Sequence, residues 1–171
     1  RGGLFERWSD YSRVPSVYAW EGFTVHTPKY PLLPKVSEGI HAALMFPSLF
    51  ATVRRLHRRK AFDAVNTQWL YPDGVAAAWT THLLRLPHVM TALGCDANLF
   101  LTQRHKQIQI DWALRHSQGV TVVSDALRQF LVEHGHGSAH IDVIPNGVDS
   151  EMFYPRDRAE AARVLNVAPT G

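Results

Sequence analysis

Several features that would point to particular protein classes are missing from this sequence. It has a single cysteine, Cys95, which excludes an intrachain disulfide and gives no reason to place the chain in an oxidising compartment. No apolar run approaches the ~20 residues that a membrane-spanning helix needs, and we find no signal peptide. The net charge is only +3, and without a basic stripe this argues against nucleic acid as a partner.

The familiar catalytic and cofactor motifs are also absent. The chain has no Gly-x-Gly-x-x-Gly dinucleotide fingerprint, no Walker lysine loop and no pair of His or Cys residues at zinc spacing. Ser124 is not surrounded by a Gly-x-Ser-x-Gly elbow, so a hydrolase nucleophile is not expected there. His134, His136 and His140 are close together but lie among glycines, and we expect no metal site from them.

What remains is the composition of an ordinary globular protein, with 46% hydrophobic and 19% charged residues in 171. The first residue is Arg rather than Met, and residues 168–171 resemble a shortened loop, so we expect a fragment of a longer protein. Residues 1–23 carry scattered aromatic side chains, including Phe5, Trp8 and Tyr11, and are predicted to be irregular. Residues 24–27 are predicted to form a short strand.

From residue 62 onward, short apolar strands alternate with helices. Strands are predicted at 64–66, 88–92, 119–123 and 141–144, and helices at 75–84, 104–115 and 125–133, with Ser124 capping the last of these. A helix is also predicted to begin at Pro47 and to run to Arg59, and another spans 156–165. This rhythm is typical of βαβ units, so we predict an α/β fold: a Rossmann-like parallel sheet with helices on both faces.

Two predicted loops leave strands at the carboxyl edge, where open parallel sheets bind ligands. The loop at 67–74 offers aromatic rings that could stack on a sugar or base, and Asp73 either accepts hydroxyl protons or caps the next helix. The loop at 93–98 has Gly94, which allows close approach of the backbone, while its polar residues either contact a ligand or cap a helix. The candidate binding residues are Trp69, Tyr71, Asp73, Gly94, Asp96 and Asn98.

The string VIPNGVD at 143–149 follows the last predicted strand. Pro-Asn-Gly is a turn signal, since Gly147 tolerates positive φ and Asn146 accepts it better than most residues. The amide of Asn146 could also bond to phosphate oxygens or ribose. The string is therefore either a turn that ends the strand or a donor-side contact at a domain hinge.

The end of the helix predicted at 47–59 is strongly basic, with Arg54, Arg55, Arg58, Arg59 and Lys60. One interpretation is a solvated helix terminus, where cations complement the helix dipole. The other is a peripheral contact with an anionic membrane surface.

Taken in order, several strings resemble the amino-terminal domain of family 4 glycosyltransferases, which have the GT-B fold, and within them the subgroup typified by teichuronic-acid biosynthesis enzymes. The likeness covers residues 24–165. It is carried by FDAV at 62–65, YPDGVAA at 71–77, LPHVMT at 86–91, GCD at 94–96, VVSDAL at 122–127 and VIPNGVD at 143–149, with Phe153 and Pro155 after.

This resemblance implies a cytoplasmic enzyme that transfers a sugar from a nucleotide-sugar donor to a sugar, lipid-linked or glycan acceptor, with retention and without a required metal or other cofactor. Residues 1–144 would form a partial acceptor-side domain that lacks its first strand. Residues 145–171 would form the interdomain linker and the start of a carboxyl-terminal domain, which holds most donor contacts and is missing here. Asn146 and Gly147 would face the donor or fix the hinge. The chain by itself is then expected to be inactive.

Two positions depart from the family pattern. Many relatives have His or Arg where this chain has Leu93, and several have His where it has Gln68. No catalytic residue is therefore assigned. Two alternatives stay open at this point: a GT-B nucleotide-sugar epimerase, and a catalytically degenerate domain that binds a sugar or a partner.

Overall fold

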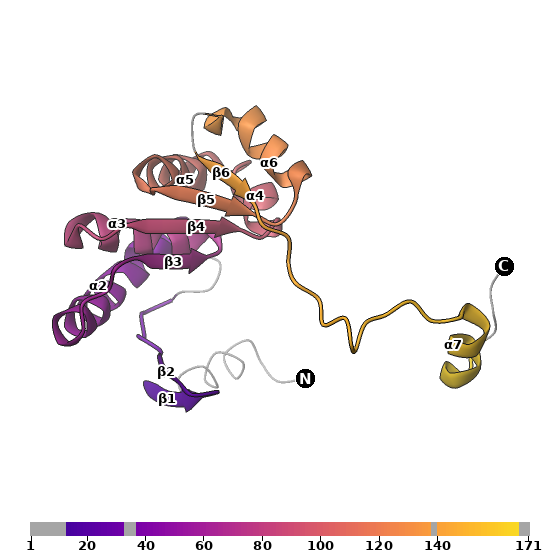
Figure 1. Ribbon diagram of the computed structural model, residues 1–171. Coiled ribbons are helices and arrows are strands. Elements are labelled where there is room, and N and C mark those ends of the chain that lie inside the picture. Colours follow the sequence, from indigo (N-terminus) through magenta and orange to yellow (C-terminus); the bar gives the residue numbers. More distant parts are fainter. Residues whose placement is uncertain (1–12, 33–36, 138–139, 168–171) are drawn as a thin grey trace.

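The computed structural model describes residues 13–32, 37–137 and 140–167. Its centre is a parallel sheet in the order β3–β4–β5–β6, formed by Val65–Gln68, His88–Ala92, Gly119–Val122 and Ile141–Val143 (Figure 1). All four predicted strands of the sheet are confirmed, with ends that shift by up to two residues. The predictions for residues 1–12 and 168–171 fall outside the described residues.

Helices α3 (Val75–Leu84), α5 (Arg104–His116) and α6 (Asp125–Leu131) lie between consecutive strands, and α2 (His41–Arg59) lies against α3. Their buried side chains join one apolar cluster with Met90 and Val122 from the sheet. The predicted α/β fold with a parallel sheet is confirmed, but in the described part of the chain α2, α3, α5 and α6 pack on one face and not on both. Right-handed crossovers between strands whose order does not reverse place α3, α5 and α6 on the same face.

The opposite face of the sheet is polar and partly open. Thr91 pairs in register with Gln68 on one side and Thr121 on the other, so the three side chains form a row across this face. The Gln68 amide donates to Thr91 Oγ1 at 3.1 Å, and the two threonine hydroxyls are 2.7 Å apart. Because strand side chains alternate, the buried Met90 and Ala92 point to the helical face.

Helix α2 corrects a second prediction, because it begins at His41 and continues through Pro47. The proline was expected to start a new helix. Pro47 is exposed, and its missing N–H removes one intrahelical bond, while Ser48 Oγ donates to the Met45 carbonyl at 3.0 Å beside it. Packing of α2 against α3 stabilises one continuous helix despite this loss.

Three short helical segments lie between the strands and the longer helices or extend those helices. Leu70–Gly74 forms the helical turn η2, Cys95–Phe100 forms α4, and Val132–His136 extends α6 as the turn η3. Helix α4 was predicted as loop; burial of Ala97 and Leu101 favours the helical turn there. The predicted cap is confirmed, since Ser124 Oγ accepts the Leu127 N–H at 3.2 Å.

Residues 17–26 form an antiparallel hairpin that the sequence did not predict in full. Its strands are β1 (Val17–Trp20) and β2 (Phe23–His26), joined by Glu21 and Gly22, which both have positive φ. Two consecutive residues with positive φ are typical of a type I′ hairpin turn. A further short helical turn, η1 (Glu38–Ile40), precedes α2.

After β6 the chain leaves the sheet as an extended arm that ends in α7 (Arg158–Leu165) (Figure 1). Apolar side chains on the arm are exposed, among them Val148 and Phe153. Asp157 caps α7 by accepting the Glu160 N–H at 2.9 Å. Across the described residues, no helix is both long and apolar enough to cross a membrane.

Candidate functional site

The two predicted loops meet at the carboxyl edge of the sheet, because β3 and β4 are parallel neighbours. Asp96 joins them. Its Oδ2 accepts the Leu70 N–H at 2.8 Å from one loop, and its Oδ1 accepts the N–H groups of Leu93 at 3.0 Å and Gly94 at 2.8 Å from the other. The Asp96 side chain is fully buried, so in this structure it supports both loops and offers no surface to a ligand.

Tyr71 also supports the loops from inside. Its ring is buried, its hydroxyl donates to the Glu38 carbonyl at 2.9 Å, and its edge meets Phe100 with 5.6 Å between centroids. A tyrosine in this position cannot stack on a sugar in the way the sequence suggested. It instead ties η2 to η1 and α4.

A buried lysine, Lys106, lies against the rings of Tyr71 and Phe100. This residue was not identified from the sequence. Its ammonium lies 4.5 Å from the Phe100 centroid and 5.5 Å from that of Tyr71, a cation–π arrangement, and no ion pair among the described residues includes it. Burial, reinforced by the Lys106 charge, lowers the pKa of His41. Helical spacing could have found Lys106, since it shares the buried face of α5 with Ile110 and Ala113.

Gly94 has φ +121°, and a Cβ built there would meet no atom within 4 Å. The conformation therefore favours glycine while the space beside it stays open, as the predicted close approach of a ligand requires. Trp69 has φ +84°, a strained value for a non-glycine residue, and its side chain is half-buried. Around this opening, Gln68, Leu93 and Asn98 are exposed.

Asp73 lies apart from that opening. It makes no side-chain cap at the start of α3, whose cap residue is Gly74, so the capping alternative is not seen. Instead it lines a cavity of about 200 Å³ between α2, β3 and α3. Burial raises the pKa of the Asp73 carboxyl. Burial also raises the pKa of Tyr30, and the nearby Asp73 charge adds to that shift.

Asn146 and Gly147 lie on the arm and are exposed. The predicted turn is absent: residues 144–149 are extended, and Gly147 is not among the residues with positive φ. Pro145 fixes only its own φ and favours an extended Ile144, so the string can continue straight where nothing packs against it. Because β6 is parallel to β5, the arm leaves the sheet at the same carboxyl edge as the loops. Among the described residues, no hydrogen bond joins Asn146 or Gly147 to those loops.

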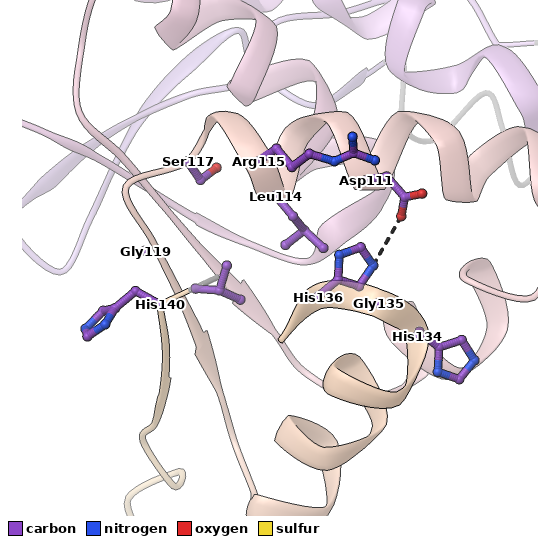
Figure 2. Close-up of a pocket in the computed structure, with 10 residues that line it drawn as sticks. Asp111, Leu114, Arg115, Ser117, Gly119, His134, Gly135, His136 and His140 are labelled. Carbon is purple, nitrogen blue, oxygen red and sulfur yellow. Dashed lines mark ion pairs between the residues drawn. The ribbon is translucent and has the colours of Figure 1, made fainter. Parts of the chain in front are cut away.

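The amino edge of the same sheet holds a larger pocket, of about 610 Å³ (Figure 2). It includes the three clustered histidines. His136 Nε2 lies 3.1 Å from Asp111 Oδ1, while His134 and His140 lie on opposite sides and point away from that pair (Figure 2). No group of three or more His, Cys, Asp or Glu residues in the described ranges could hold a metal ion.

His88 fixes the strands at this amino edge. It is fully buried, with Nε2 against Thr67 Oγ1 and Nδ1 at 3.0 Å from Ser117 Oγ, and its backbone N–H donates to Gln118 Oε1 at 2.6 Å. Burial lowers the pKa of His88 to about 4, so the ring is neutral at pH 7. With both ring nitrogens in hydrogen bonds, His88 acts as a structural link.

Comparison with known proteins identifies the family and a similar fold. A model of glycosyltransferase family 4 matches residues 11–152. A glycosyltransferase of Methanocaldococcus jannaschii is 26% identical over 95 residues, which cover 56% of this chain and 26% of that protein. The sucrose-phosphate synthase structure from Thermosynechococcus elongatus superposes with a TM-score of 0.64 at 16% identity, over 91% of this chain and 40% of that one. The chain thus spans well under half the length of either protein.

Proposed function

Because this chain belongs to glycosyltransferase family 4, we propose that it forms the acceptor-side part of an enzyme that transfers a sugar from a nucleotide-sugar donor. The acceptor would be a sugar, a lipid-linked sugar or a glycan, in polysaccharide or glycoconjugate biosynthesis. The similarity of the fold to sucrose-phosphate synthase supports a GT-B architecture with a cleft at this sheet edge.

The observation that carries the proposal is the pair of loops that Asp96 holds at the carboxyl edge. Three backbone N–H groups converge on one buried carboxylate, so both loops are fixed before any ligand arrives. The space beside Gly94 is open, and the same two loops carry Trp69 and the exposed Asn98, an aromatic face and an amide suited to sugar hydroxyls. We assign acceptor contacts to these three residues, with Tyr71 and Asp96 as their support and Asp73 in the neighbouring cavity.

The finer parts of the proposal rest on the sequence resemblance. They are retention of configuration, no requirement for a metal or other cofactor, and membership of the teichuronic-acid subgroup. Residues 1–144 would be the partial acceptor-side domain, and residues 145–171 a linker leading to a donor-binding domain. The exposed apolar residues of the arm, such as Phe153, support a further partner surface for that segment.

We also propose a cytoplasmic location with contact to the inner face of a membrane. Five cations, Arg54, Arg55, Arg58, Arg59 and Lys60, lie at the end of α2, and all are exposed. Juxtaposed basic side chains of this kind attract anionic lipid headgroups by about 1 kcal/mol each. A lipid-linked acceptor would make such contact useful.

The test uses the full-length protein with a panel of nucleotide-sugars, with and without acceptors, and with a chelator present. We expect transfer that needs an acceptor and persists with the chelator. Asn146→Ala should raise the KM for the donor, with about tenfold lower kcat/KM if one charge-assisted hydrogen bond is lost. The control is Asn166→Gly at the end of α7, which removes an exposed amide and keeps the φ of +53° without strain.

Other results would change the assignment. Interconversion of the nucleotide-sugar without an acceptor would indicate the epimerase instead. Donor binding without turnover across the acceptor panel would favour the degenerate binding domain, which the exposed Leu93 supports, since leucine cannot donate a proton beside the Gly94 opening. Unchanged kinetics in Asn146→Ala would leave that residue without a role in donor use.

A further inference from the structure

The pocket at the amino edge of the sheet lies at the opposite ends of the strands from the loops that Asp96 joins. Gly119 begins β5 and His140 immediately precedes β6, while Leu114 and Arg115 come from the last turns of α5 (Figure 2). Its volume of about 610 Å³ is within the range of small-molecule sites. Nothing in the proposed transfer reaction uses it.

His136 forms one wall of this pocket, and its side chain is 7% exposed. Its Nε2 faces Asp111 Oδ1 at 3.1 Å, but the two atoms are not aligned for a hydrogen bond, and neither has another partner among the described residues. The other ring nitrogen, Nδ1, faces the Leu114 side of the pocket (Figure 2).

The protonation of His136 decides what it can bind. Burial lowers its pKa, Arg115 and His134 lower it further, and Asp111 opposes them. The ring is therefore neutral at pH 7. The negative charge of Asp111, 3.1 Å from Nε2, favours the tautomer with its proton on that nitrogen. Nδ1 is then left to accept a hydrogen bond, and a hydroxyl group is a suitable donor.

Arg115 supplies the positive charge. It follows Asp111 by one helical turn, it is exposed, and its guanidinium extends along α5 toward Asp111 (Figure 2). No ion pair among the described residues includes Arg115. A guanidinium without a carboxylate partner, at the rim of a pocket, is suited to bind a phosphate or carboxylate in bidentate fashion.

We propose that this amino-edge pocket is a second ligand site, which binds a small polyhydroxylated molecule that carries a phosphate group. The phosphate bonds to Arg115, and a ligand hydroxyl donates to His136 Nδ1, whose orientation Asp111 sets. The site does not depend on the transferase activity, because it shares no residue with the carboxyl-edge loops.

Three probes test the phosphate contact and the hydroxyl contact separately in the full chain. They are glucose 6-phosphate, glucose and inorganic phosphate. Each is titrated by calorimetry, and the histidine Cε1–H resonances are followed by NMR. We expect glucose 6-phosphate to bind at least about tenfold more tightly than either of the other two, the difference that one added hydrogen bond of ~1.4 kcal/mol gives. Bound phosphate should also raise the pKa of His136, since a nearby negative charge favours the imidazolium.

The matched variants are Arg115→Gln and Arg128→Gln. Arg128 is exposed and paired with Asp125 at 3.0 Å, and it does not line the pocket. Arg115→Gln should weaken glucose 6-phosphate binding by about tenfold or more, and Arg128→Gln should leave it unchanged. Both side chains are exposed, so neither variant should fail to fold.

Three outcomes would overturn the proposal. The first is no binding of glucose 6-phosphate at about 10 mM, weaker than any useful site. The second is equal affinity for glucose 6-phosphate and inorganic phosphate, which would remove the role of the hydroxyl. The third is equal loss of binding in Arg115→Gln and Arg128→Gln, which would indicate a general charge effect.

Discussion

The two edges of the sheet hold an aspartate in different ways. At the carboxyl edge, Asp96 accepts three backbone N–H groups and is fully buried. At the amino edge, Asp111 faces only His136, without an aligned hydrogen bond, beside a pocket of about 610 Å³. The first arrangement fixes loops in place before a ligand binds. The second leaves an ion pair without an aligned hydrogen bond at the wall of a pocket.

The largest expected effect comes from making the same substitution at both edges. Asp96→Asn replaces one acceptor oxygen by an NH₂ group that faces backbone donors, so it should lower the free energy of unfolding by roughly 2–4 kcal/mol. Asp111→Asn should lower it by less than about 1 kcal/mol, because its partly exposed carboxylate makes a single unaligned contact. Urea unfolding of the two variants measures the difference. Equal losses would remove the distinction between the edges.

The next prediction concerns pH and the amino edge. The pKa of His88 is about 4 in the folded protein, below its ordinary value of 6.5, because burial disfavours the charged ring. The contribution of neutral His88 to the free energy of unfolding is therefore fully present above pH 6.5. It decreases as the pH falls toward 4, by up to roughly 3 kcal/mol.

Unfolding of the full chain in urea at pH 7.5 and at pH 4.5 measures this loss. The pKa values of His41 and His136 are also lowered, so His88→Gln is needed to isolate the effect of His88. The variant should be less stable at pH 7.5 but should lose less stability on acidification. A variant with an unchanged pH dependence would show that His88 does not titrate as the structure indicates.

The smallest predicted effect compares two glycines, one from each edge. Gly94→Ala has free space for its methyl group but requires φ +121°, so strain alone should cost about 1–3 kcal/mol. Gly119→Ala would place its Cβ 3.9 Å from Val89 Cγ2 with no positive φ, and it should change stability by less than about 0.5 kcal/mol. Thermal unfolding of both proteins provides the measurement. A harmless Gly94→Ala would mean that the second loop is not held in this conformation.

The sequence by itself determined the local elements. Strands rich in β-branched residues, such as Gly119–Val122, and the Ser124 cap follow from preferences within a few residues, and they were predicted before the structure. The loops of the candidate site were also predicted, because the rhythm of strands and helices places them at one edge.

Only the tertiary structure decided what those residues do. Asp96 and Leu70 are 26 positions apart, so no local pattern shows that one bonds to the other and that Asp96 is a support, not a ligand contact. Continuation of α2 through Pro47 depended on its packing against α3, and the placement of α3, α5 and α6 on one face depended on the strand order. Residues 143–149 carry a strong local turn signal, but residues 145–149 are exposed, and no other element of the described chain packs against them. The chain there leaves the sheet as an arm without the turn (Figure 1). Local preferences are worth about 1 kcal/mol or less for a residue, so the contacts that burial creates decide between them.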